Sequence, residues 1–121
     1  MLVLEKTDRI NILFDIYGCL LTERQRELIM MYYFEDLSLA EIAEELGISR
    51  QAVFFGLKRS EELLEKYESS LGLLKKLNNY EEQINRVIDL LKDYRATGEE
   101  DKLNSAIVSL EKISNYWQFI N

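Results

Sequence analysis

Four side chains in the stretch SRQAVFFGLKR are of types that contact nucleic acid, Arg50, Gln51, Lys58 and Arg59. Arginine and glutamine can read base edges through paired hydrogen bonds, and lysine and arginine suit phosphate oxygens. Phe54 stands between them in the sequence, and its ring could contact a thymine methyl group. These residue types predict a strip that reads bases and binds phosphates, provided that one element presents them together.

The element that must present these side chains is a predicted helix that begins at Ser49, because serine is a preferred N-cap residue. Apolar residues at helical spacing continue to about Glu68, and Ala52, Val53 and Leu57 are expected to hold the helix to the core. Ser49 and the N-terminal half of the helix would then project outward. In a helix-turn-helix, this half enters the major groove.

The residues before this helix predict that it is the second helix of a helix-turn-helix. In LAEIAEELGISRQAVFFGL, Ala43 precedes Gly47 by four residues and Val53 follows Gly47 by six. Two helices that cross steeply need a small residue where they touch, a glycine that tolerates a left-handed turn, and apolar residues facing a third helix. The apolar residues that meet the last need are Ile42, Leu46, Ile48, Val53 and Leu57.

Net charge limits how broad a basic surface can be, because the 121 residues carry a formal net charge of −7. Residues 1–70 contribute −6 and residues 71–121 contribute −1. Within residues 48–60, however, all three charged residues are basic, so this window carries +3. Since phosphate attraction supplies most non-specific affinity for nucleic acid, the expected contact is a narrow positive strip flanked by acidic residues.

Arg24 and Arg26 complete the predicted site, because they could add phosphate contacts from the side. They lie in the first turns of another predicted helix, which runs to about Phe34. Thr22 and Gln25 have the form of a capping box at its start, in which the side chain of each residue accepts a hydrogen bond from the backbone N–H of the other.

Two further helices complete the N-terminal part of the chain. The first is predicted over residues 4–19, and Gly18 can end it. Another begins at a second capping box, Ser38 with Glu41, and stops at Gly47. The apolar residues that would lie on one face, along the first helix and just past its end, are Ile10, Leu13, Phe14, Tyr17 and Leu21.

The C-terminal part is predicted to be a helical hairpin, so the chain divides into a helix-turn-helix domain over residues 1–70 and an extension over residues 71–121. Residues 96–98 separate two apolar stripes. One stripe contains Ile84, Val87, Ile88, Leu91 and Tyr94, and the other contains Leu103, Ile107, Leu110, Ile113 and Trp117.

A two-helix hairpin cannot bury two stripes alone, so it must pack on the N-terminal domain or on another copy. Trp117, Phe119 and Ile120 would be either a clasp onto the core or an interface anchor. We expect a homodimer, because a two-fold pair would also present two helix-turn-helices.

Several positions carry expectations about burial. The aromatic cluster Tyr32 to Phe34 is expected to complete the core, and Cys19 is expected to be a buried small hydrophobe. Gly56 inside a helix predicts close packing or a local bend, since glycine disfavours helices. Of the adjacent Phe54 and Phe55, at least one is expected to pack inward.

The composition gives no support for an enzyme, a metal site or a cofactor site. The chain has no histidine and one cysteine, which removes the usual nucleophilic pair and zinc ligand sets. The five glycines are scattered, so no phosphate-binding loop is evident. The N-terminus lacks the basic and apolar regions of a signal peptide. No uninterrupted apolar run comes near the length of about 18 residues that a membrane helix needs. We expect a cytoplasmic protein without membrane insertion.

The run LLTERQRELIMMYYFEDLSLAEIAEELGISRQAVFFGLKRSEELLEKYE resembles the fourth region of bacterial sigma factors, which reads the upstream promoter element. Together with EKTDRINILFDIYGCLLTERQ, it is similar to the YlxM family over about residues 4–68. That resemblance implies an all-α, sigma region 4-like helix-turn-helix bundle. It also implies an accessory role in the signal recognition particle pathway, with duplex DNA, the particle's RNA or its proteins as partners.

Two functions remain open at the level of sequence. One is a helix-turn-helix regulatory protein that binds nucleic acid through the positive strip. The other is a protein interaction module that keeps the fold without binding nucleic acid, which the acidic balance and the Phe54-Phe55-Gly56 run favour. A complete sigma factor would need further regions for which 121 residues leave no room.

Overall fold

The computed structural model describes the backbone of residues 6–120 and the side chains of residues 6–115. Every regular element within that range is a helix, so the predicted all-α helix-turn-helix fold is confirmed. Its helices fall into two compact units, residues 1–74 and 75–121. No described helix combines the length and apolar content needed to cross a bilayer.

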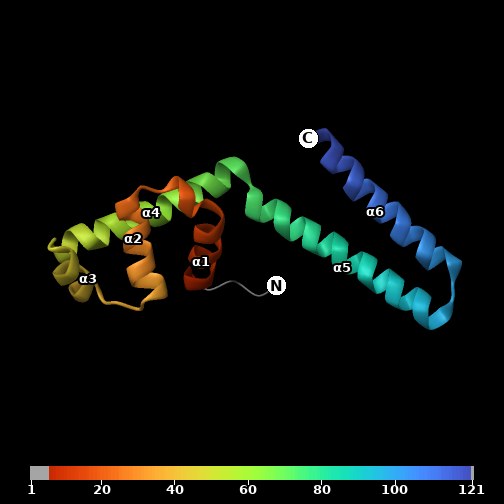
Figure 1. Cartoon of the computed structure of the whole chain (residues 1–121), viewed down its shortest axis with the longest axis horizontal. Coiled ribbons are helices and arrows are strands. Elements are labelled where there is room, and N and C mark those ends of the chain that lie inside the picture. The colour runs from red at the N-terminus through yellow and green to blue at the C-terminus, as the bar shows by residue number, and fades with distance from the viewer. Residues whose placement is uncertain (1–5, 121) are drawn as a thin grey trace. The chain divides into compact units, whose positions relative to one another are not determined.

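The N-terminal unit is organised around one long helix, α4, against which α1, α2 and α3 all pack (Figure 1). Side chains from all four helices meet in one apolar core, which includes the fully buried Leu13, Ile29, Ile42, Val53 and Leu64. The elements in chain order are α1 (Lys6–Tyr17), η1 (Gly18–Leu20), α2 (Glu23–Ile29), η2 (Met30–Phe34), α3 (Leu39–Leu46) and α4 (Arg50–Leu71).

Both predicted capping boxes are present. The backbone N–H of Thr22 donates to Gln25 Oε1 at 2.9 Å, and the N–H of Gln25 donates to Thr22 Oγ1 at 3.2 Å. Ser38 and Glu41 make the same reciprocal pair, with both distances 3.1 Å. These side chains satisfy amides that the first turns of α2 and α3 leave without partners.

The turn between α3 and α4 has the geometry that the sequence predicts. Gly47 ends α3 with φ of 67°, a left-handed conformation that glycine adopts without penalty. The N–H of Ile48 donates to the Ala43 carbonyl at 3.1 Å, which closes the turn. Ser49 then caps α4, because its Oγ accepts from the N–H of Ala52 at 3.0 Å.

The aromatic cluster at residues 32–34 behaves differently from the expectation. These residues form a π-helical turn, in which the N–H of Glu35 donates to the Met30 carbonyl at 3.0 Å. Tyr33 is buried, but Tyr32 and Phe34 are 40% and 45% exposed, so the expectation that all three complete the core is wrong. Consecutive residues on a helix point in different directions, so three of them cannot share one buried face.

Two small residues are also more exposed than the sequence indicates. Cys19 is exposed, because it lies in the short 3₁₀ turn η1, where Gly18 faces inward and Cys19 and Leu20 face outward. Ala52 is exposed as well, since it lies about 100° around α4 from the buried Val53. The expected burial of Cys19 and the expected core role of Ala52 are therefore wrong.

The C-terminal unit contains the predicted helical hairpin. Its helices are α5 (Leu73–Thr97) and α6 (Glu100–Ile120), and Gly98 lies between them with φ of 73°. The two helices run in opposite directions (Figure 1). The side chains of Trp117, Phe119 and Ile120, for which a clasp or an interface was expected, lie outside the described residues.

Candidate nucleic-acid interface

The N-terminal half of α4 presents the predicted strip on its outer side. Val53 and Leu57 are buried and fix the orientation of the helix. Arg50, Gln51, Lys58 and Arg59 are all exposed, as is the N-cap residue Ser49. The exposed positions spread over about half of the helix circumference at about 100° for each residue.

Acidic residues further along α4 are bound to basic residues of α1. Lys6 Nζ lies 3.4 Å from Glu61 Oε2. Arg9 donates from Nε and Nη2 to the two carboxylate oxygens of Glu65, at 2.5 and 2.8 Å. This hydrogen bonding to Glu65 is the main cause of the raised pKa of Arg9. Two of the carboxylates that follow the strip are thus neutralised from within the fold.

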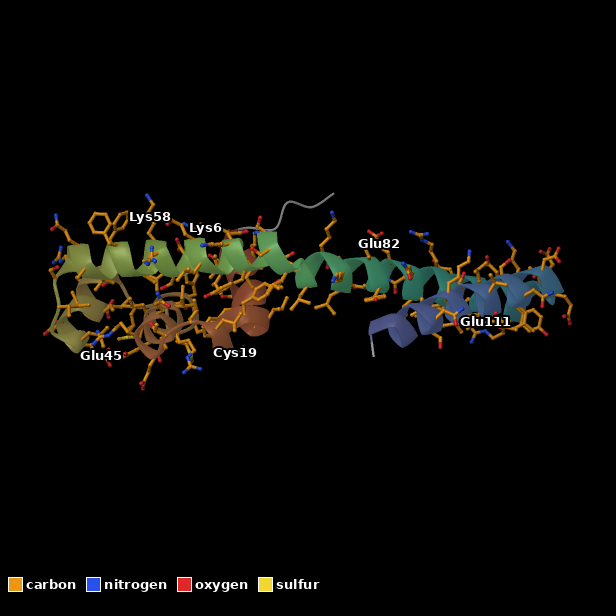
Figure 2. The ribbon with its side chains drawn as sticks, turned by 90° about the horizontal axis from the view of Figure 1, so that it is seen from above. Lys6, Cys19, Glu45, Lys58, Glu82 and Glu111 are labelled. Atoms are coloured by element: carbon orange, nitrogen blue, oxygen red, sulfur yellow. The ribbon has the colours of Figure 1, made fainter. Side chains whose placement is uncertain are left out.

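The basic residues of the strip have no such partners. Arg50, Lys58 and Arg59 form no ion pair within 4 Å with any residue that the structure describes. Figure 2 shows Lys58 projecting outward from α4, with Glu45 of α3 on the opposite side of the unit. The charge of these three residues is therefore available to an external anion.

Arg24 and Arg26 lie elsewhere on the unit. The Arg24 guanidinium is 3.9 Å from the Glu27 carboxylate, one turn along α2. Arg26 is exposed and borders a shallow hollow that α1 and α2 form with Cys19. The structure does not bring these two arginines into a common hollow with the strip, so their predicted side contacts would need a ligand that spans both surfaces.

A second hollow lies directly beside the strip. Phe54 and Lys58 form one wall, and Lys6 and Tyr33 belong to the other. The Tyr33 hydroxyl donates a hydrogen bond to Glu61, and burial followed by this hydrogen bond raises the pKa of Tyr33. Sequence reasoning missed the second wall. No local pattern could have indicated it, because Lys6 and Tyr33 are more than 20 residues from Phe54 and Lys58 in the chain.

Both phenylalanines of the strip face outward, so the expectation that at least one packs inward is wrong. Phe54 is 48% exposed and Phe55 is 62% exposed. Their rings contact each other edge to face, with centroids 5.4 Å apart and an interplanar angle of 72°. The inner side of α4 is already occupied by Val53 and Leu57, and both phenylalanines are displaced from it by the helical rotation.

Gly56 confirms the expectation of close packing. A Cβ at this position would lie 2.6 Å from Leu28 Cδ1, closer than non-bonded carbon atoms approach in proteins. Leu28 of α2 is buried, with 3% of its surface exposed. The absence of a side chain at Gly56 therefore lets α2 approach α4 immediately behind the strip.

The site as a whole can bind an anionic or aromatic ligand through cations and exposed rings. Among the described side chains, no group of three His, Cys, Asp or Glu residues is placed to hold a metal ion. The predicted residues Arg50, Gln51, Phe54, Lys58 and Arg59 come together on one element.

Comparison with known proteins places the chain in a family. The family model UPF0122, described as "Putative helix-turn-helix protein, YlxM / p13 like", matches residues 4–105. The UPF0122 protein YlxM of Bacillus subtilis is 46% identical over 110 residues, which cover 91% of this chain and 97% of that protein.

Two further relatives agree with this assignment. A UPF0122 protein of Bacillus velezensis is 44% identical, again over 91% of this chain and 97% of the relative. A UPF0122 protein of Bacillus thuringiensis is 43% identical over 92% of this chain and 99% of its own length. The predicted resemblance to the YlxM family is thus confirmed, and the chain belongs to the UPF0122 family of YlxM-like helix-turn-helix proteins.

Proposed function

We propose that this chain is a nucleic-acid-binding regulatory protein, without enzymatic activity, that inserts the N-terminal half of α4 into the major groove. The observation that carries the proposal is the contrast in ion pairing. Lys6 and Arg9 are bound to carboxylates of α4, whereas Arg50, Lys58 and Arg59 have no acidic partner among the described residues. Cations that the fold leaves available on a helix-turn-helix are suited to phosphates.

The individual roles follow from residue chemistry. Arg50 and Gln51 read base edges, while Lys58 and Arg59 bind phosphates. Phe54 contacts an apolar base edge such as a thymine methyl. Ser49 is occupied as the N-cap of α4, which holds the first turn in position for the groove.

The cellular role in this proposal is an accessory function in signal recognition particle protein targeting, in the cytoplasm. Support comes from membership of the YlxM-like family, because the resemblance of the sequence to that family implies the pathway. The ligand is duplex DNA, whose major groove admits α4, or the RNA of the particle, whose phosphate backbone the same cations can follow without entering a groove.

A salt series on the full chain tests the proposal. Binding to generic duplex DNA and to signal recognition particle RNA is measured for the wild type, for Lys58→Ala and for Lys66→Ala. Each lost phosphate contact lowers the slope of log K against log[salt] by about 0.9 on duplex DNA. Lys58→Ala is therefore expected to weaken binding several-fold and reduce the slope by about one. Lys66 is a matched control, since it is an exposed lysine two turns further along α4.

Equal behaviour of these two variants would contradict the assigned strip. A stronger challenge is the Arg50→Ala and Lys58→Ala double variant. If it binds both nucleic acids with wild-type salt dependence, α4 is not the binding element.

A second function, a protein interaction module, is favoured by the exposed Phe54 and Phe55. Two adjacent rings that are each about half exposed or more form an apolar patch unusual for a charged helix. In this case the chain would show no affinity for nucleic acid even at low salt, and Phe55→Ser would weaken binding to a protein of the targeting pathway. Leu20→Ser, at a 51% exposed position outside α4, is the control.

A further inference from the structure

The hairpin of the C-terminal unit has apolar stripes that are wider than one neighbouring helix can cover. In heptad notation, α5 has apolar residues at a and d and at the central e position, a pattern typical of a helix within a bundle rather than of a helix with a single partner. The a positions are Leu77, Ile84 and Leu91, the d positions are Tyr80, Val87 and Tyr94, and Ile88 occupies an e position.

Burial divides this stripe into a covered edge and an open edge. At the d positions, Val87 is 4% exposed, and Tyr80 and Tyr94 are partly buried. The open edge consists of the a and e residues, with Leu77 55%, Ile84 47%, Ile88 41% and Leu91 40% exposed. One row of the stripe has a partner within the unit, and the adjacent row has none among the described side chains.

Helix α6 repeats the same division. Ala106, at a d position, is fully buried, and Ile113, at the next d position, is partly buried. The neighbouring e and a residues, Ile107 and Leu110, are 45% and 47% exposed. On each helix the open row is displaced from the buried d row in the same rotational sense. Because α5 and α6 are antiparallel (Figure 1), the two open rows therefore lie on the same side of the hairpin. The hairpin therefore has one continuous apolar face.

We propose that this face binds the same face of a second copy of the chain, which completes an antiparallel four-helix bundle with α5 against α5. A hairpin with two open apolar rows is one half of such a bundle, and a two-fold axis supplies an identical half. Large exposed apolar patches are uncommon on proteins that remain monomeric. Neither argument depends on nucleic-acid binding, so the inference stands apart from the proposed function.

Charges beside the open row fit this partner. Glu81 and Lys92 are 11 residues apart, which puts them about 20° apart around α5, at the same margin of the stripe. An antiparallel alignment that places Ile84 beside Ile88 of the second copy also places Glu81 beside Lys92 of the second copy, twice by symmetry. Neither residue forms an ion pair within 4 Å among the described residues.

Sedimentation equilibrium of the full chain tests the proposal. The wild type is expected to be a dimer, and Ile88→Asp is expected to raise the dimer dissociation constant by about a hundredfold or more, because it buries two carboxylates in the bundle. Val108→Asp is the matched control. Val108 is 49% exposed on α6 but lies at an f position, away from the apolar face. Circular dichroism of each variant checks that its helices are kept.

Charge reversal tests the antiparallel alignment. Glu81→Lys and Lys92→Glu should each weaken the dimer by about tenfold, and the double variant should restore it, because both symmetric pairs are re-formed. A monomeric wild type would overturn the proposal, because the face would then be covered by another protein or by another part of the chain. Equal disruption by Val108→Asp and Ile88→Asp would overturn it too, and a double variant that fails to recover would overturn the α5 against α5 pairing.

Discussion

Gly56 of α4 and Leu28 of α2 approach so closely that a Cβ on Gly56 would lie 2.6 Å from Leu28 Cδ1. The contact sits between the core and the exposed strip, so it determines how near α2 comes to the helix that carries the candidate interface. A glycine in the middle of a helix costs about 1 kcal/mol relative to alanine. This helix accepts that cost and gains a close helix contact.

Gly56→Ala is expected to destabilise the protein by about 1 kcal/mol, because overpacking costs about 1 to 3 kcal/mol and exceeds the gain in helix propensity. In a Leu28→Ala background, the same substitution should be neutral or stabilising, since the clashing atom is gone. Urea denaturation of the four proteins in this double-mutant cycle measures the coupling. Additive effects would show that Leu28 is not what excludes a side chain at position 56.

Tyr17 connects the end of α1 to the junction between α4 and α5. Its hydroxyl donates to Glu68 Oε1 at 2.6 Å and accepts from the N–H of Leu73 at 3.1 Å. Glu68 Oε1 also accepts from the N–H of Leu74 at 2.9 Å. Tyr17→Phe is therefore expected to lower the free energy of unfolding by about 1 to 3 kcal/mol, because it removes the acceptor of the Leu73 N–H and one of the hydrogen bonds that Glu68 accepts.

Tyr67→Phe serves as the control, since the Tyr67 hydroxyl is 3.4 Å from the Leu20 carbonyl and loses little. Burial and the Glu68 hydrogen bond raise the pKa of Tyr17. A raised pKa stabilises the neutral phenol in the fold, so this contribution is complete below about pH 10 and is lost as the pH rises above it. If Tyr17→Phe has the same alkaline loss of stability as the wild type, Tyr17 does not titrate in this way.

The sequence predicted what is encoded locally. Thr22, Ser38 and Gly47 were placed correctly because a cap or a left-handed turn depends on residues within about four positions. Phe54 and Phe55 were misjudged because their exposure depends on how the rotation of α4 is fixed by the rest of the core. The bonds from α1 to the carboxylates of α4 join residues more than 50 positions apart, and no spacing rule indicates them.

The capping boxes of α2 and α3 differ in one respect that pH should reveal. Gln25 closes the first box and cannot ionise, whereas Glu41 closes the second. Hydrogen bonding to Ser38 lowers the pKa of Glu41, first through the backbone N–H of Ser38 and second through its side-chain hydroxyl. A lowered pKa gives stability that is present above the unfolded-state value of about 4.3 and is lost as the pH falls through the folded-state value.

Glu41→Gln is therefore expected to reduce the loss of stability between about pH 5 and pH 3, because glutamine can close the box at any pH. Gln25→Glu should do the reverse and add an acid-sensitive step at the start of α2. Urea denaturation across this pH range compares both variants with the wild type. Parallel pH profiles for all three proteins would show that neither box responds to acid.

Glu62 is the carboxylate most closely associated with the strip, since it is exposed and follows Lys58 by four residues on α4. It forms no ion pair with a described residue, whereas Glu65 is bound to Arg9. Under the proposed function, Glu62→Gln removes a repulsion from phosphates and is expected to raise affinity for duplex DNA several-fold at low salt, with a smaller gain at high salt.

Glu65→Gln is the matched comparison. It frees Arg9 as it removes its own charge, so it should also add one positive charge, but on the side of α4 that faces α1. A larger gain for Glu65→Gln than for Glu62→Gln would mean that nucleic acid approaches across α1 rather than along the outer strip.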